Sequence, residues 1–209
     1  MFQKEAAWLA QRLAGYSAEA LSPVLNLGSS TEEFRSKTQP WIDELIFAPL
    51  RQRNVQVIHC DLKQAPGVDL THNILEEEGF AALKALQPRT VLLCNILEHV
   101  LEPGLLTRRA LDVLQPGGRL IVTVPRSYPH HRDPIDTMFR PTPEDVATFV
   151  PEAILEHAAI LPTGTHWDDI FARPRKIASK RFKWLFTPYL VSFAVLLKPL
   201  DGQTEEAGA

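Results

Sequence analysis

The amino-acid sequence predicts an α/β protein built on an open, mostly parallel β-sheet with helices on both faces. Short apolar runs that suit buried strands alternate with segments that suit helices over most of the 209 residues. Glycine and proline turns punctuate this alternation. Two further apolar runs near the C-terminus are expected to add an antiparallel edge. Together these observations describe a Rossmann-like sheet.

The first half of the chain is expected to hold two strands with helices before and after them. Residues 3–14 place apolar side chains at helical spacing, so we expect a helix there. Residues 23–27 are expected to form the first strand, ending at Gly28. Ser30 stands three residues before Glu33, the spacing of a capping box, which predicts a helical turn starting at Ser30. The elements that follow are strands over residues 55–59 and 68–72 and helices over residues 40–52 and 75–87.

The second half continues the alternation. We expect a strand over residues 91–94 and a helix over residues 104–115, which the Pro-Gly-Gly turn at 116–118 ends. The next strand covers residues 119–124 and is expected to stop at Pro125. Thr142 is followed by a proline and a glutamate, which predicts the start of a helix. The last two strands are expected within residues 154–161 and 190–197.

Composition sets limits on the class of protein. The net charge of −3 gives no general attraction to nucleic acid or membranes. The two cysteines, Cys60 and Cys94, lie inside apolar runs, which indicates a reducing cytoplasm and no disulfide framework. The uncharged run near the C-terminus is too short to span a bilayer. We expect an N-terminal amphipathic helix within residues 1–20, one domain over residues 21–200 and a disordered tail over residues 201–209.

The loop after the first strand is the first candidate ligand site. Gly28 ends that strand, and in open α/β sheets ligands bind beyond the carboxyl ends of the strands. Only one glycine is present, whereas loops that hold a pyrophosphate use several. Asp61 also follows Gly28 by 33 residues, longer than the roughly 20-residue step of dinucleotide-binding proteins. A ligand with a ribose and no phosphate fits better, although an ordinary turn at Gly28 and a helix cap at Ser30 remain the alternative.

Three segments of the sequence resemble one enzyme family. They are VLNLGSS at 24–30, VLLCNILEHVLEP at 91–103 and ALDVLQPGGRLIVTVP at 110–125. Their order and spacing resemble the class I methyltransferases that use S-adenosylmethionine, in particular the small-molecule, methyltransferase-11-like branch. The resemblance covers roughly residues 20–150. Most members carry a glycine-rich loop after the first strand, and many have an acid where this chain has Asn26, so the loop here is reduced.

The resemblance implies S-adenosylmethionine as cofactor and assigns residues to its parts. Asp61 would hold the ribose hydroxyl groups. His99 would lie near the methyl group and is a candidate base, with a simple hydrogen bond to a backbone group as the alternative. Gly28 and Ser29 would lie against the methionine part, with Asn26 behind them. Asn73 and Ile74 would contact the adenine ring. Asn95 and Ile96 would line the cofactor after the fourth strand.

The loop after the fifth strand is dense in polar side chains and lies where similar methyltransferases bind their acceptor. Its histidines, His130 and His131, join His99 as candidate general bases. A metal site is not expected, because adjacent side chains on an extended segment point in opposite directions. The aspartates have a second interpretation, in which they pin the loop through Arg132 and Arg140. The expected acceptor-binding residues are Tyr128, Asp133, Asp136 and Arg140.

Residues 171–186 carry six basic side chains, no acid and several aromatic residues. Such a stretch suits an anionic membrane surface or a phosphate-bearing acceptor. The favoured interpretation is a solvated helix face with aromatic anchors in the core. Nothing in the chain resembles a motif that reads nucleic-acid bases.

The sequence therefore predicts a cytoplasmic methyltransferase, with peripheral membrane association left open, that acts on a polar small molecule or a glycan- or lipid-linked acceptor. The alternative is a catalytically silent binding or scaffold protein of the same fold, which the reduced loop and Asn26 favour. A nicotinamide-dependent oxidoreductase is weakened by the single glycine and by the late position of Asp61.

Overall fold

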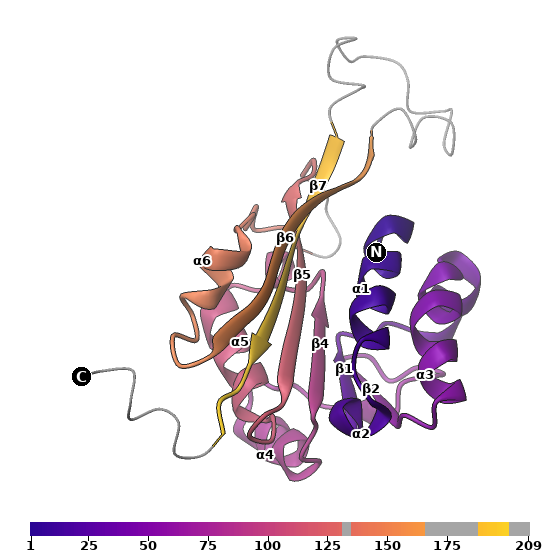
Figure 1. Ribbon diagram of the computed structural model, residues 1–209, viewed down its shortest axis with the longest axis vertical. Helices are drawn as coiled ribbons and strands as arrows, with labels where there is room; N and C mark the ends of the chain where they lie inside the picture. The colour runs from indigo at the N-terminus through magenta and orange to yellow at the C-terminus, as the bar shows by residue number, and fades with distance from the viewer. Residues whose placement is uncertain (131–134, 166–187, 201–209) are drawn as a thin grey trace.

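The computed structural model describes residues 1–130, 135–165 and 188–200. Within these residues a seven-stranded sheet has the order β3-β2-β1-β4-β5-β7-β6 (Figure 1). The first five strands are parallel, and β7 is antiparallel to both β5 and β6. This confirms the α/β fold class and its antiparallel edge. The strands are β1 (Val24–Leu27), β2 (Val57–Asp61), β3 (Leu70–Thr71), β4 (Thr90–Cys94), β5 (Arg119–Ser127), β6 (Ile154–Thr165) and β7 (Pro188–Leu197).

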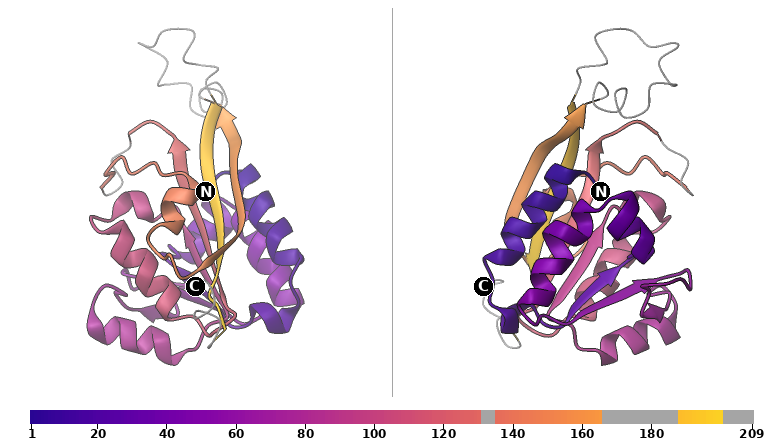
Figure 2. Two further views of the ribbon diagram at one scale, coloured as in Figure 1. Left: turned by 60° about the vertical axis from the view of Figure 1, so that its left-hand side comes forward. Right: turned by 90° about the vertical axis from the view of Figure 1, so that its right-hand side faces the viewer.

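Helices cover both faces of the sheet (Figure 2). One face packs against α1 (Gln3–Ala14), α2 (Ala18–Leu21), the π-helical turn η2 (Asp43–Phe47) and α3 (Ala48–Gln52). The other packs against α4 (Glu77–Ala85), α5 (Pro103–Asp112) and α6 (Pro143–Ala147). The remaining short elements are η1 (Phe34–Thr38) and η3 (Leu97–His99).

The central strands are apolar throughout because both of their faces are buried. In β4, Val91 and Leu93 pack with α4 and α5, whereas Leu92 between them packs with α1 and α3. Successive side chains of a strand point to opposite faces, so a strand covered on both sides needs an unbroken apolar run. Apolar burial on both faces fixes the position of the strands' carboxyl ends, where the candidate site lies.

Two local expectations are wrong, one about where a strand ends and one about which residue caps a helical turn. Strand β5 does not stop at Pro125 but continues to Ser127, with a register shift between the two. Proline is tolerated there because β4 pairs with β5 only as far as Thr123, so Pro125 has a partner strand on one side alone. Likewise Ser30 does not cap the following helical turn. Thr31 does, its hydroxyl accepting from the N–H of Phe34 at 3.1 Å.

Other local expectations are confirmed. Helix α1 spans residues 3–14, and α6 opens with a capping box in which Thr142 and Asp145 bond each other's backbone N–H groups. Among the described residues, no helix is long and apolar enough to cross a membrane. The basic stretch 171–186 and the tail 201–209 lie outside the described residues.

Candidate functional site

The strand order reverses between β1 and β4, and the loops that leave these two strands lie next to each other. Strand β1 pairs with β2 on one side and with β4 on the other, all parallel. The carboxyl ends of the strands therefore meet at one edge of the sheet. This reversal is the place where open α/β sheets bind ligands.

Gly28 and Ile96 meet across this reversal. Gly28 has a φ of +64°, a left-handed conformation that side chains disfavour, and a Cβ placed there would lie 2.2 Å from Ile96 Cδ1. The glycine is required twice, once for the turn and once for the close approach of Ile96. The structure thus brings two predicted cofactor residues together and places an apolar side chain over the single glycine.

Arg35, which the sequence analysis missed, fixes the loop after β1. Its Nη1 donates to the carbonyls of Ser29 at 2.9 Å and Ser30 at 2.6 Å, and its Nη2 donates to the carbonyl of Gly67 at 2.7 Å. Burial lowers the pKa of Arg35, while nearby acids, Asp69 first, oppose the shift. A buried guanidinium thus holds a loop that has only one glycine. No sequence signal marks this role, because the carbonyl of Gly67 comes from a distant loop.

The carboxylate of Asp61 receives two backbone hydrogen bonds. Oδ2 accepts from the N–H of Ser30 at 2.7 Å, and Oδ1 accepts from the N–H of Lys63 at 3.1 Å. An ionised carboxylate has about four lone-pair sites, so two sites remain for other donors. Asp61 therefore lies beside the β1 loop in an orientation that leaves room for its predicted contact with ribose hydroxyls.

Asn26 lies inside the sheet beside His59. The amide Nδ2 of Asn26 is 3.1 Å from Nδ1 of His59. Burial, assisted by the charge of Arg35, lowers the pKa of His59 to about 4, so its ring is neutral near pH 7. A neutral ring nitrogen can accept from the amide, whereas an acid at position 26 would offer no donor. Asn26 can therefore donate a hydrogen bond that an acid at this position could not. Its predicted place behind the methionine part of the cofactor stays a prediction.

Asn73 and Ile74 lie at the turn before α4. Oδ1 of Asn73 accepts from the N–H of Leu75 at 3.0 Å, and its Nδ2 donates to Glu76 Oε1 at 2.9 Å. Ile74 is buried in the core beneath α4 and α5. These contacts give Asn73 a local structural role, and its predicted adenine contact remains a prediction.

Asn95 is held by a buried acid from the N-terminal helix. Its Nδ2 donates to Glu5 Oε1 at 2.7 Å, and the hydroxyl of Thr123 donates to the same oxygen at 2.6 Å. Glu5 is fully buried and joins α1 to the ends of β4 and β5. Sequence reasoning missed Glu5, yet a signal was present: it lies four residues before Leu9 and eight before Leu13, on the apolar stripe of the helix.

His99 and Glu98 lie in η3, beneath the loop that follows β5. Nδ1 of His99 contacts the carbonyl of Ile135, and its Nε2 lies 3.7 Å from Glu98 Oε1. The backbone carbonyl of Glu98 accepts from the N–H of Thr137 at 2.9 Å and from its hydroxyl at 3.1 Å. Burial raises the pKa of Glu98 to about 7. The predicted catalytic histidine is therefore a partly exposed side chain that lies against the buried carboxyl group of Glu98.

Among the predicted acceptor-binding residues, Tyr128 lies in an aromatic cluster, whereas Asp136 and Arg140 form an ion pair. Tyr128 packs its ring against Phe2 and Tyr189, with ring centroids 5.6 and 4.7 Å apart. Asp136 bonds Arg140 at 2.7 Å and has no exposed side-chain surface, so this pair pins the loop in the way that the second interpretation proposed.

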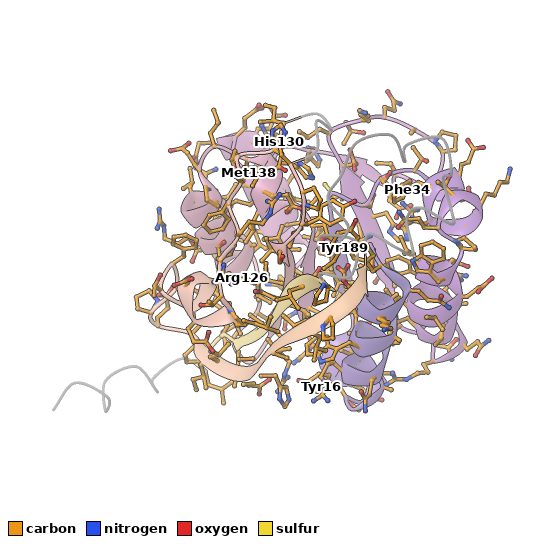
Figure 3. All side chains as sticks on the ribbon, turned by 90° about the horizontal axis from the view of Figure 1, so that it is seen from above. Tyr16, Phe34, Arg126, His130, Met138 and Tyr189 are labelled. Carbon is orange, nitrogen blue, oxygen red and sulfur yellow. The ribbon has the colours of Figure 1, made fainter. Side chains whose placement is uncertain are left out.

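His130 is exposed and lies on the same part of the carboxyl edge as Met138, away from Phe34 near the β1 loop (Figure 3). His131 and Asp133 fall outside the described residues. Within the described part of the chain, no group of three His, Cys, Asp or Glu side chains is arranged to hold a metal ion.

Comparison with known proteins supports the fold. No family model matches the sequence, and no curated protein matches it. Among solved structures, a candidate sarcosine dimethylglycine methyltransferase from Galdieria sulphuraria has a TM-score of 0.59 at 13% identity, covering 94% of this chain and 86% of its own. The 1,6-didemethyltoxoflavin-N1-methyltransferase of Burkholderia thailandensis, solved with S-adenosylhomocysteine, has a TM-score of 0.54 at 16% identity, covering 94% and 78%.

A third similar structure carries a different activity in its name. The [4+2]-cyclase SpnF has a TM-score of 0.52 at 13% identity, covering 93% of this chain and 81% of its own. The chain thus has the fold of class I S-adenosylmethionine-dependent methyltransferases. At these identities the likeness concerns the fold, because one fold hosts several chemistries.

Proposed function

We propose that the protein is an S-adenosylmethionine-dependent methyltransferase that binds its donor at the carboxyl edge, where β1 and β4 end. The observation that carries this proposal is the pairing of a left-handed Gly28 with Asp61 on the adjacent strand. The backbone of Ser30 orients the carboxylate of Asp61 while two of its lone-pair sites stay open. A ribose offers two neighbouring hydroxyl donors to such a group.

The donor's parts are assigned to residues on both sides of the strand reversal. Asp61 holds the ribose, while Asn73 and Ile74 face the adenine. The methionine part lies along Gly28 and Ser29, with Asn26 behind them and with Asn95 and Ile96 opposite. Because Ile96 covers Gly28, the donor packs on the Ile96 side chain as well as on the loop backbone.

The donor supplies a sulfonium-bound methyl group that is already electrophilic, so the chain has to align the acceptor and exclude water. We place the acceptor beside the loop after β5, near Tyr128, His130 and Arg140. Its class is a polar small molecule or a glycan- or lipid-linked compound. His99, His130 or His131 provides the base.

The basic stretch 171–186 supports a contact with an anionic surface or with a phosphate on the acceptor. We place the protein in the cytoplasm, with peripheral association through this stretch. These two assignments depend on sequence composition alone.

A second candidate function is a catalytically silent protein of the same fold. It is favoured because the protein's own side chains already bond predicted cofactor residues. Arg35 binds the carbonyls of Ser29 and Ser30, and Glu5 binds Asn95. The SpnF cyclase demonstrates that proteins of this fold are not restricted to methyl transfer.

Calorimetric titration with S-adenosylmethionine and with S-adenosylhomocysteine separates these functions. We expect wild type to bind both and Asp61→Asn to bind at least roughly tenfold more weakly, the scale of one hydrogen bond to a charged group. Asp145→Asn is the matched control, because Asp145 also accepts a backbone N–H, from Thr142 at 2.8 Å, at the start of α6. Failure of folded wild type to bind either compound contradicts the proposal, and tight binding of NADH instead favours an oxidoreductase.

A further inference from the structure

Glu98 and His99 are neighbours in sequence whose side chains also face each other. Glu98 is 1% exposed, and its Oε1 lies 3.7 Å from Nε2 of His99. Its second carboxyl oxygen, Oε2, is buried and has no hydrogen-bond partner among the described residues. A buried carboxylate with one oxygen left in this way is disfavoured as an anion, because burial removes the water that would compensate its charge.

The contact of His99 with the carbonyl of Ile135 determines which of the two ring nitrogens carries the hydrogen in the neutral ring. A carbonyl oxygen only accepts, so Nδ1 of His99 carries the hydrogen in that contact. In a neutral ring Nε2 is then the nitrogen with the lone pair. A lone pair facing a carboxylate oxygen is unfavourable unless one of the two groups holds a proton.

Among the described residues, two other charged groups act on Glu98, and both have partners of their own. Arg140 uses its Nη2 to bond Asp136, and its buried Nε has no hydrogen-bond partner in the described part of the chain. Glu5 accepts from Asn95 and Thr123 and adds a second negative charge. Burial is the main cause of the raised pKa of Glu98. A hydrogen bond from its own backbone N–H, then His99 and Arg140, act in the opposite direction, and Glu5 acts in the same direction. His99 is therefore the one group among these positioned to share a proton with Glu98.

We propose that Glu98 and His99 hold one proton between them near neutral pH, and that this pair receives the proton lost by a protic acceptor, above all a hydroxyl. The second half of this statement rests on the proposed methyltransferase function. Methyl transfer to a hydroxyl breaks the O–H bond and the methyl–sulfur bond, forms an O–C bond and leaves one proton. The pair receives that proton after its own shared proton has dissociated to water, and it then returns to the one-proton form. Glu98 is the positioning residue, because it stabilises the imidazolium form of His99.

The shared proton is tested by nuclear magnetic resonance in the protein without any ligand. Titration of protein labelled with ¹³C at its histidine rings and glutamate carboxyl groups follows both residues, and His99→Asn assigns the His99 signal. We expect each residue to report the titration step of the other. In Glu98→Gln the midpoint of His99 should fall by about one pH unit, since removing a nearby negative charge disfavours the protonated ring.

Glu144→Gln is the matched control, because Glu144 is exposed on α6 and the substitution removes the same charge. An identical His99 titration in wild type, Glu98→Gln and Glu144→Gln overturns the shared proton. If Glu98→Gln does not fold, wild type alone decides: a Glu98 carboxyl that titrates fully in the ordinary acid range, independently of His99, also overturns it.

The link to catalysis has its own readout. Once turnover is measurable, the acidic limb of the kcat/KM profile should move to lower pH in Glu98→Gln and stay in place in Glu144→Gln. An unmoved limb contradicts the catalytic role of the pair even if the shared proton is present. Failure to bind S-adenosylmethionine contradicts the proposed function instead, and leaves the ligand-free titration unaffected.

Discussion

The two halves of the carboxyl edge are built differently. On the β1 side, Arg35 and Asp61 together bond five backbone groups of nearby loops, at distances of 2.6 to 3.1 Å. On the β4 side, Glu5 bonds Asn95 and Thr123 across 90 and 118 residues of sequence, and Glu98 Oε2 and Arg140 Nε have no hydrogen-bond partner within the described part of the chain.

This difference indicates a division of roles between the two sides. Backbone groups tied to buried side chains make a preformed surface, which suits a cofactor that does not vary. Buried polar atoms without partners are costly unless a proton or a ligand compensates them. We therefore expect substitutions on the β1 side to act on stability and donor binding, and substitutions on the β4 side to act on pH dependence.

The largest effect is expected for Arg35→Ala. It leaves three carbonyls without their donor, and we expect a loss of about 3 kcal/mol in the free energy of unfolding, measured by urea denaturation. Arg51→Ala is the matched control, because Arg51 forms an exposed ion pair with Asp43 and such pairs contribute about 0–1 kcal/mol. Equal losses of unfolding free energy in the two variants would show that Arg35 stabilises the protein no more than an exposed arginine does.

Gly28→Ala is expected to cost about 2 kcal/mol of stability and to weaken donor binding. The φ of +64° is unfavourable for alanine, and the new Cβ meets Ile96. Adding Ile96→Ala to this variant should recover the part due to the collision and leave the part due to the backbone. A double-mutant cycle by urea denaturation measures the two parts, and strict additivity would show that Ile96 does not press on position 28.

Glu98→Gln is expected to change how stability depends on pH. The unfolded carboxyl loses its proton near 4.5, whereas the folded one, with its pKa raised to about 7, keeps it, so stability falls as pH rises between these values. His59 acts in the opposite direction: its pKa falls from 6.5 to about 4, so stability rises with pH over that interval. Without Glu98, the free energy of unfolding should rise more steeply from about pH 5 to 6.5 than in wild type. An unchanged slope in urea titrations contradicts the raised pKa of Glu98.

Thr31→Ala should cost about 1 kcal/mol, the usual loss for a helix cap, whereas Ser30→Ala should change stability little. Thermal unfolding of both variants measures the difference. A larger loss of stability in Ser30→Ala than in Thr31→Ala would show that Ser30 is the helix cap, as the sequence predicted.

The sequence predicted the features that depend on local pattern. The apolar runs around Leu92 and the cap at Thr142 follow from neighbouring residues, and the structure has them. The single glycine at position 28 was recognised as a turn, and Asp61 was placed at the same edge of the sheet. What failed depends on distant partners. Ser30 does not cap the turn because its φ of +56° is left-handed, whereas a capping residue has extended backbone, and its N–H bonds Asp61, 31 residues away.

The buried charges were the hardest features to predict. Only the folded chain brings Glu5 to Thr123 and Arg35 to Gly67, although the place of Glu5 on the apolar stripe of α1 already marked it as buried. The role of Glu98 depends on a loop that folds back so that Ile135 contacts His99. The partners in these contacts come from distant segments, so single segments of the sequence do not reveal them.

Chemical-shift mapping of backbone amides during titration with S-adenosylhomocysteine tests the central proposal most directly. We predict saturable shifts at Gly28, Ser29 and Asp61 on one side and at Asn95 and Ile96 on the other, with none at the turn formed by Gly117 and Gly118 at the opposite end of the sheet. Saturable binding whose shifts avoid the ends of β1 and β4 would contradict the account.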